Sequence, residues 1–254
     1  MTTPTSEVDV LSALPSAAAA IAVEHLEVVR GTRTVLEDIS VVVTPGSITG
    51  LLGPSGSGKT TLLRAIVGVQ HVSAGTVSVL GAPAGTPALR RDIGYVTQTP
   101  SVYEDVTVAQ NVRYFASLYG RGHRHPDEVI EEVGLARQSG QLVGSLSGGQ
   151  RSRCSLACAL VAEPKVLVLD EPTACQDPLV REQLWDQFRQ LARSGVAIIV
   201  SSHVMAEAER CDRLLLIRDG RVAAEGTPAE LRALTGAEDM DEAFLTLARA
   251  QAVA

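Results

Sequence analysis

The sequence predicts an α/β fold in which helices cover both faces of a mostly parallel β-sheet. Three observations support this fold class: strand-like apolar runs alternate with helical patterns, a phosphate-binding motif joins one strand to a helix, and a long helical stretch interrupts the alternation. Parallel strands need long crossover connections, which helices supply, so the alternation itself indicates a parallel sheet. The interrupting stretch, about residues 99–162, is expected to be a helical insertion between two halves of the sheet.

The first elements are predicted to be strands, because apolar and polar residues alternate along the chain. This pattern predicts strands at residues 21–29 and 35–43, with a turn at Gly31-Thr32 between them. A third, apolar strand follows at 48–52, and apolar residues at helical spacing after residue 61 predict a helix. Glycines at 75 and 81 are expected to bound a strand at 76–80.

The later elements alternate between strand and helix. Residues 106–137 are mostly helical in pattern, and Pro126 can open a second helix there because the first helical turn does not need its missing N–H. Asp219-Gly220 predicts a hairpin turn into residues 221–224. The remaining predictions are strands at 93–97, 166–169, 196–200 and 214–217, and helices at 147–161, 178–193, 204–210 and 239–250.

Length and composition limit both the domain organisation and the function. We expect residues 1–20 to be a disordered leader, 21–235 to form the main domain and 236–254 to end the chain with a helix. The net charge of −7 and the aromatic fraction of 3% argue against a nucleic-acid partner. No apolar run reaches the roughly 18–20 residues that cross a bilayer, so we expect no membrane span. The cysteines form no C-x-x-C pair and are expected to be buried, reduced thiols: Cys154, Cys158, Cys175 and Cys211.

The motif G-x-x-x-x-G-K-T, a phosphate-binding loop, follows the predicted strand at 48–52. Its glycines let the backbone curl around phosphate oxygens, and the N–H groups of the loop and of the next helix attract an anion. Lys59 adds a positive charge for the terminal phosphates, and the Thr60 hydroxyl can bind Mg²⁺. The alternative, a glycine-rich turn that merely contains Lys-Thr, does not explain the strand–loop–helix context. The predicted nucleotide-binding residues of this motif are Gly53, Pro54, Ser55, Gly56, Ser57, Gly58, Lys59, Thr60 and Thr61.

Two carboxylates, Asp170 and Glu171, follow the apolar strand at 166–169. Ligands of open α/β sheets bind at the carboxyl ends of the strands, which is where these acids are expected. Asp170 would hold Mg²⁺ directly or through water, and Glu171 is placed to take a proton from an attacking water molecule. The alternative is a strand end with solvated acids, which the upstream phosphate loop disfavours.

Leu146-Ser147-Gly148-Gly149-Gln150 is the most specific motif. Ser147 can cap a helix whose first N–H groups the glycines expose, which makes a second anion site on the same chain. With this motif the chain resembles the ATPase subunit of ATP-binding cassette (ABC) transporters over about residues 21–235. The resemblance implies the ABC ATPase fold, which is a P-loop NTPase sheet core with an antiparallel β subdomain and an inserted α-helical subdomain. It also implies ATP and Mg²⁺ as ligands.

The same resemblance implies a head-to-tail dimer. In the family, the segment equivalent to Ser147–Gln150 meets the γ-phosphate of ATP held by the other subunit, which is here expected to be a second copy of the chain. Gln98 is similar to the glutamine that binds Mg²⁺ and senses the membrane partner, and His203 to the histidine that bonds the γ-phosphate. Asp177-Pro178 resembles the end of the D-loop, which crosses the dimer interface.

Residues 99–108, directly after Gln98, match the region that receives the coupling helix of the permease in similar ATPases. Tyr103 is expected to supply an apolar anchor there. The alternative is a loop that only joins the sheet to the helical insertion, and both descriptions can hold at once.

Two positions depart from the family pattern. Arg30 stands where an aromatic residue usually stacks on adenine, and a guanidinium plane can also stack on a base, so Arg30 is a candidate adenine platform. The alternative is a solvated arginine in a turn. Ala174-Cys175-Gln176 precedes Asp177, where Gly-Leu or Ala-Leu is common, and this change is expected to alter dimer contacts.

The resemblance implies an ATP-hydrolysing subunit that powers a membrane exporter, with a separate transmembrane permease and a location on the cytoplasmic face of the membrane. The runs 50–56, 93–98 and 243–247 resemble drug and antibiotic exporters. Importers are less favoured, since many carry an extra C-terminal domain. A soluble ABC ATPase without a permease, such as the iron–sulfur assembly type, stays open as the alternative. A P-loop kinase has no role for the L-S-G-G-Q motif or for His203.

Overall fold

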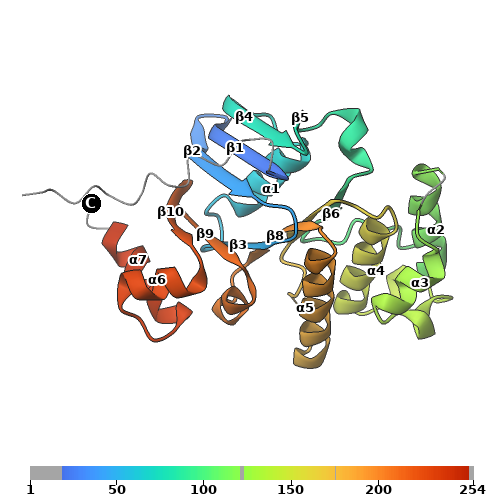
Figure 1. The fold of residues 1–254 in the computed structure, drawn as a ribbon. Helices are drawn as coiled ribbons and strands as arrows, with labels where there is room; N and C mark the ends of the chain where they lie inside the picture. Colours follow the sequence, from blue (N-terminus) through green and yellow to red (C-terminus); the bar gives the residue numbers. More distant parts are fainter. Residues whose placement is uncertain (1–18, 121–122, 175, 252–254) are drawn as a thin grey trace, which may run out of the picture.

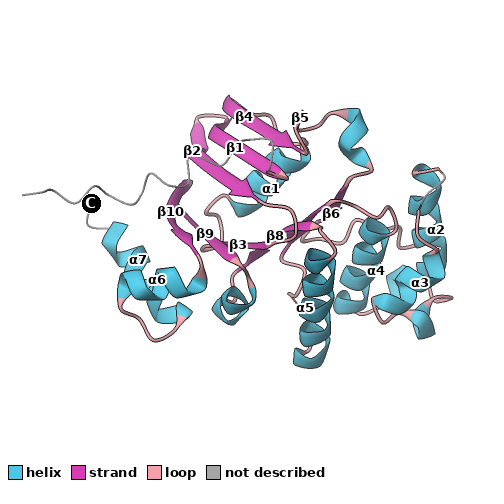
Figure 2. Cartoon of the chain, viewed as in Figure 1, coloured by secondary structure: helices cyan, strands magenta, loops and turns pink. Residues whose placement is uncertain are grey.

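The computed structural model describes residues 19–120, 123–174 and 176–251, and Figure 1 shows their arrangement. A larger sheet runs through the middle of the molecule, a smaller sheet lies against it, and helices flank the larger sheet at both ends (Figure 2). The expected leader, residues 1–20, lies outside the described residues except for Ala19 and Ala20. Ala20 is buried, and its N–H donates to the Val43 carbonyl oxygen over 2.8 Å.

In the described part of the chain, the larger sheet has six strands, which are parallel except for the pair β10–β9 at one edge. Their order across the sheet is β10 (Arg221–Gly226), β9 (Arg213–Arg218), β3 (Ile48–Leu52), β8 (Ala197–Ser202), β7 (Val166–Asp170) and β6 (Ile93–Val96). The smaller sheet is antiparallel, in the order β2 (Arg33–Val43), β1 (Ile21–Arg30), β4 (Ala74–Val79) and β5 (Ala82–Pro83). The predicted fold class is confirmed.

Alternate residues of the central strands enter two different cores. Val166 and Val168 of β7 pack with the smaller sheet and helix α1 (Lys59–Val67), whereas Leu167 and Leu169 pack with the helices on the opposite face. Side chains of successive strand residues point to opposite faces, so a strand covered on both sides must be apolar throughout. This requirement explains why the strand at 166–169 reads as an unbroken apolar run.

Helices cover the second face and both ends of the larger sheet. The insertion between β6 and β7 contains α2 (Val108–Leu118), α3 (Pro126–Glu132) and α4 (Gly148–Leu160), and α5 (Pro178–Arg193) follows β7. At the other end of the molecule, α6 (Pro228–Thr235) and α7 (Met240–Gln251) follow β10 (Figure 1). No helix in the described ranges is both apolar enough and long enough to span a bilayer.

Several local predictions were wrong. The helix expected at 204–210 is a 3₁₀ helix, Met205–Arg210, which apolar spacing over so short a segment does not distinguish from an α-helix. Gly75 lies inside β4 and does not bound it, because its backbone passes so close to β1 that a Cβ would come within 2.2 Å of the His25 carbonyl oxygen. Helix α6 was not predicted, although Thr227 and Glu230 form a capping box at its start.

Candidate functional site

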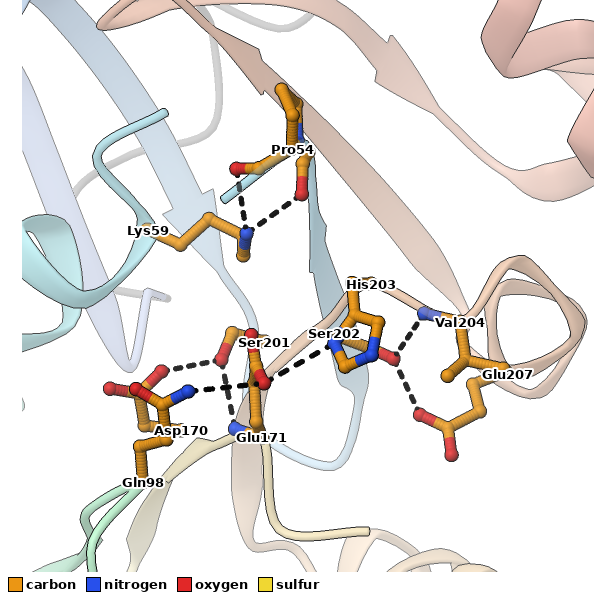
Figure 3. Close-up of polar contacts among 11 residues, drawn as sticks. Pro54, Lys59, Gln98, Asp170, Glu171, Ser201, Ser202, His203, Val204 and Glu207 are labelled. Carbon is orange, nitrogen blue, oxygen red and sulfur yellow. Dashed lines mark hydrogen bonds and ion pairs between the residues drawn. The ribbon is translucent and has the colours of Figure 1, made fainter. Parts of the chain in front are cut away.

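The predicted site residues gather at the carboxyl ends of neighbouring parallel strands. The register pairs Leu52 of β3 with Ser202 of β8, and Ser201 with Asp170 of β7, so these three strands end at the same level. The phosphate loop follows β3, Glu171 follows β7 and His203 follows β8. Gln98 follows β6 at the same edge, and Figure 3 shows it beside Glu171, with His203 on the other side of that carboxylate.

The phosphate loop is packed tightly against strand β9. A Cβ on Gly53 would lie 2.1 Å from the Ile217 carbonyl oxygen, and the φ of Gly53 is +151°, so this position accepts only glycine. The Lys59 ammonium is buried and donates to the carbonyl oxygens of Gly53 (2.7 Å) and Pro54 (3.0 Å). Burial lowers the pKa of Lys59, and the carboxylates of Glu171 and Asp170 oppose that shift by favouring the charged form.

A cleft of about 450 Å³ opens in front of this loop. It brings together residues from the smaller sheet, the phosphate loop and the ends of β6 and β7. Its lining residues are Arg30, Arg33, Val35, Ser55, Gly56, Gly58, Lys59, Thr60, Thr61, Gln98 and Glu171. The cleft therefore unites most of the predicted nucleotide-binding residues, which come from distant parts of the sequence.

The two carboxylates have different surroundings. Asp170 is 2% exposed, and its Oδ1 accepts a hydrogen bond of 2.7 Å from the Ser201 hydroxyl. Glu171 has a φ of +52°, in the left-handed region, and its N–H donates to the same Ser201 hydroxyl over 3.0 Å. A strained backbone at a strand end must be held by its surroundings, and Ser201 supplies one such contact. The Glu171 side chain is thereby directed into the cleft, whereas Asp170 stays below it.

Glu171 also joins two other predicted residues. Its Oε2 accepts from Gln98 Nε2 at 3.3 Å and lies 3.2 Å from His203 Nδ1 (Figure 3). The sequence places these residues in three separate segments, and the structure brings them to one carboxylate. The arrangement places a carboxylate, an amide and an imidazole beside the phosphate loop, which suits the activation of water next to a phosphate group.

The oxygen ligands proposed for Mg²⁺ come from the residues Thr60, Gln98 and Asp170. A hydroxyl, an amide oxygen and one carboxylate fit an ion that keeps several waters and binds phosphate oxygens directly. No cluster of three or more His, Cys, Asp or Glu side chains suited to a metal occurs in residues 19–120, 123–174 and 176–251. The two neutral oxygens and one carboxylate of this donor set fit an ion that arrives with a phosphate ligand.

The L-S-G-G-Q motif does not line this cleft. Ser147 caps α4 as expected: its hydroxyl accepts from Gln150 N–H at 3.2 Å, and Gln150 Oε1 accepts from Ser147 N–H at 2.9 Å. A Cβ built on Gly148 meets nothing within 4 Å, so this residue of the motif faces open space, whereas Leu146 and Gly149 are buried. The two predicted anion-binding motifs of the chain are thus separate, and the phosphate loop is the one that shares a cleft with Glu171.

Sequence reasoning missed several polar contacts around the site. Gln176, the residue that departs from the family pattern, is buried and donates from Nε2 to the Gly149 carbonyl oxygen over 3.0 Å. Its side chain is therefore turned inward onto α4. Cys175 lies outside the described residues. Arg33 was also missed, although it faces Arg30 across the β1–β2 hairpin and lines the same cleft. A single sequence offers little signal for these contacts beyond the presence of polar residues next to motifs.

The Arg30 side chain is held by a hydrogen bond, unlike the side chain of a fully solvated arginine in a turn. Its Nη2 donates to Gln70 Oε1 over 2.5 Å. The three described cysteines, Cys154, Cys158 and Cys211, are buried and free, as predicted. Burial raises the pKa of the Cys211 thiol, so it stays protonated and unreactive.

The segment 99–108 presents aromatic surface. Tyr103 is 50% exposed and meets Tyr114 of α2 edge-to-face, with 5.3 Å between the ring centroids. The buried Asn111 side chain holds the Tyr103 backbone through two hydrogen bonds of 2.9 Å, one from the Tyr103 N–H and one to its carbonyl oxygen. Leu118, one turn beyond Tyr114, is 59% exposed. These residues form an exposed apolar surface on the helical insertion, called here the aromatic patch (Tyr103, Tyr114 and Leu118).

Comparison with known proteins finds similarity to the ATP-binding proteins of ABC transporters. The family model described as "ABC transporter" matches residues 36–174. The Nod factor export ATP-binding protein I of Burkholderia lata is 41% identical over 208 residues, covering 79% of this chain and 68% of that protein. The probable multidrug ABC transporter ATP-binding protein YbhF of Escherichia coli is 36% identical over 222 residues, covering 83% of this chain and 38% of that protein. A solved ATP-binding subunit of an ABC transporter superposes with a TM-score of 0.83 at 30% identity, covering 90% of this chain and 99% of that one.

Proposed function

Because this chain belongs to the ABC transporter family, as an ATP-hydrolysing domain, we propose that it powers a membrane exporter whose permease is a separate transmembrane chain. The observation that carries the proposal is the meeting of Glu171, Gln98 and His203 beside the phosphate loop, with the L-S-G-G-Q motif held apart on α4. In this proposal the subunit works on the cytoplasmic face of the membrane. The relatives from Burkholderia and Escherichia are named for Nod factor export and multidrug transport, which supports export over the soluble alternative.

Each residue of the cleft has its own role in the proposed hydrolysis. The N–H groups of Gly53–Thr60 bind the phosphates, and Lys59 exchanges its two carbonyl partners for phosphate oxygens. Glu171 takes the proton from the attacking water, and His203 donates to the terminal phosphate from the other side of that carboxylate. Mg²⁺, held by Thr60, Gln98 and Asp170, would neutralise charge on the phosphates. Ser201 keeps both acids in place.

The cleft of one chain does not contain the L-S-G-G-Q motif. We assign Ser147, Gly148, Gly149 and Gln150 to the terminal phosphate bound by a second copy, because Gly148 faces open space at the start of α4, where the first N–H groups have no partner within the helix. Two copies arranged head to tail then complete two sites, and ATP itself joins them. Closing and reopening this dimer is the movement that drives the permease.

The proposal as a whole is tested by purifying the chain with the six-helix permease expected from a neighbouring gene. We expect a stable complex with ATPase activity that changes when transport substrates are added. A chain that hydrolyses ATP but never associates with a membrane protein would favour the soluble alternative. A chain that neither binds nor hydrolyses ATP would contradict the assignment.

Arg30 and Arg33 are proposed to hold the adenine. Both line the cleft on the side of the smaller sheet, and a guanidinium plane can stack on a base. We expect Arg30→Ala to weaken ATP binding about 5- to 30-fold, because a stacking contact is worth about 1–2 kcal/mol. Arg33→Ala tests whether the second guanidinium shares the role. The affinity for ATP is measured by titration, and unchanged binding in both variants and in the double variant would reject the proposed platform.

The aromatic patch is proposed to bind the permease. Tyr103→Ala combined with Tyr114→Ala removes exposed aromatic area, which is the kind of surface that dominates interface energies, but leaves Asn111 in place. We expect affinity for the permease to fall about 10- to 100-fold while hydrolysis by the free chain stays within about twofold.

Leu234→Ala is the matched control for this prediction. Leu234 is 72% exposed on α6, at the opposite end of the molecule from α2 (Figure 1). It should leave both binding and hydrolysis unchanged. An equal loss of hydrolysis and binding in the tyrosine variant would contradict a coupling role.

A further inference from the structure

The buried Ser202 side chain holds the backbone around His203. The Ser202 hydroxyl donates to Glu207 Oε2 over 2.6 Å and accepts from the Val204 N–H at 3.0 Å. His203 lies between Ser202 and Val204 in the chain. Figure 3 shows the Ser202 hydroxyl bonded to both Glu207 and Val204. The imidazole itself is 56% exposed on its side chain, so packing does little to fix it. Its position therefore depends mainly on the backbone that the Ser202 hydroxyl ties down.

Glu207 is an unusual residue to find in this place. It is 2% exposed, on the 3₁₀ helix Met205–Arg210, and a buried carboxylate is costly unless it is well paired. Its Oε2 has the Ser202 hydroxyl, but its Oε1 has no hydrogen bond among the described residues. The Arg181 Nε of α5 lies 3.7 Å from that Oε1, near enough to balance the charge. An apolar residue would suit this buried position better if stability alone decided it.

Ser201, the residue before Ser202, holds the carboxylate side of the site in the same way. Ser201 and Ser202 are successive residues at the end of β8, so their side chains point to opposite faces. Ser201 binds Asp170 and the Glu171 N–H, whereas Ser202 binds Glu207 and the Val204 N–H. The 3.2 Å contact between Glu171 Oε2 and His203 Nδ1 thus joins two groups that separate serines hold.

We propose that Ser202 and Glu207 are positioning residues that hold His203 beside Glu171 and the terminal phosphate, with Arg181 balancing the charge of Glu207 from α5. The inference rests on the proposed function as an ATPase and names residues that act through His203. Neither Ser202 nor Glu207 lines the nucleotide cleft, so loss of either should affect turnover and leave ATP binding intact.

The first test is steady-state hydrolysis by Ser202→Ala and Glu207→Ala. We expect kcat to fall about 10- to 100-fold with KM for ATP within about threefold, because misplacing a catalytic group by about 1 Å costs rate and not ground-state binding. Glu207→Gln keeps an oxygen that accepts from the Ser202 hydroxyl, so its kcat should recover to within about fivefold of the wild type. Glu209→Ala is the control, since Glu209 lies on the same 3₁₀ helix but pairs with Arg232 at the surface.

A double-mutant cycle with His203→Ala separates positioning from general destabilisation. If Glu207 acts through His203, Glu207→Ala should change kcat less than about twofold once the histidine is gone. Equal losses in both backgrounds would overturn the proposal. If thermal unfolding shows that Glu207→Ala does not fold, the same double-mutant cycle is measured with Ser202→Ala in its place.

The outcomes also separate this proposal from the one it rests on. A wild-type chain without ATPase activity, or full activity in His203→Ala, would contradict the proposed function itself. An active wild type and a strongly impaired His203→Ala with measurable residual turnover, together with fully active Ser202→Ala and Glu207→Ala, would overturn the positioning role and leave the ATPase assignment standing.

Discussion

Glu171→Gln is expected to bind ATP and lose turnover by about 10²- to 10⁴-fold, or about 3–5 kcal/mol of barrier. The amide preserves the shape of the side chain and can still accept from Gln98 or His203, but it cannot take a proton from water. ATP that binds and is not hydrolysed should hold two copies together, so the variant should elute as a dimer when ATP and Mg²⁺ are present. Phosphate release and size-exclusion chromatography measure the two effects.

Glu163→Gln is the matched control for this experiment. Glu163 lies just before β7, and Glu171 lies just after it. Both glutamates have a left-handed backbone, with a φ of +53° at Glu163 and +52° at Glu171. The control therefore makes the same chemical change at the opposite end of the same strand, away from the cleft. It should turn over at the wild-type rate. Turnover above about one tenth of wild type in Glu171→Gln would move the base to another residue.

Mixing two inactive variants is expected to restore hydrolysis. Lys59→Ala removes the positive charge of the phosphate loop, and Gly148→Asp places a negative charge in the motif that should meet the phosphate of the other copy. A Cβ at Gly148 meets nothing within 4 Å, so there is open space where the new side chain begins. Each variant alone should lose turnover by more than about 100-fold, because both of its composite sites are damaged.

In a head-to-tail mixed dimer, one site combines both defects and the other combines an intact phosphate loop with an intact motif. Random mixing should therefore restore up to about one quarter of the wild-type sites. The control mixes the Lys59→Ala chain with a chain that carries both Lys59→Ala and Gly148→Asp. Every site in this mixture lacks Lys59, so the mixture should stay inactive. Failure of the first mixture to recover, although it forms dimers, would exclude a site shared between two copies.

Much of the fold could be predicted from local pattern. The apolar runs at 48–52, 166–169 and 196–200 became central strands because a strand buried on both faces admits few polar residues. Boundaries were less predictable. The helical stretch at 106–137 breaks into α2, α3 and the start of a short 3₁₀ helix, Ala136–Gln138, and left-handed glycines at 120 and 134 follow the two α-helices.

The candidate site was predictable to a different extent for each residue. Gly53–Thr60 and Ser147–Gln150 are continuous motifs, so their chemistry is readable from neighbours in the chain. Gln98 and His203 carried meaning only through the family resemblance, since a single glutamine or histidine at a strand end is common. Glu207 carried no signal, because nothing in the sequence shows that an acid on a polar 3₁₀ segment is 2% exposed.

The sequence by itself determined the family, which the comparisons confirm, and its motifs predicted nucleotide phosphate binding beside a carboxylate. These features depend on residues that are adjacent in the chain and on apolar periods that local structure imposes. The tertiary structure alone decided which polar groups meet. Gln98 reaches Glu171 across 73 positions, Ser201 reaches Asp170 across 31, and Gln176 reaches Gly149 across 27. Such contacts are set by the register of parallel strands and the packing of α4 and α5, which no short stretch of sequence contains.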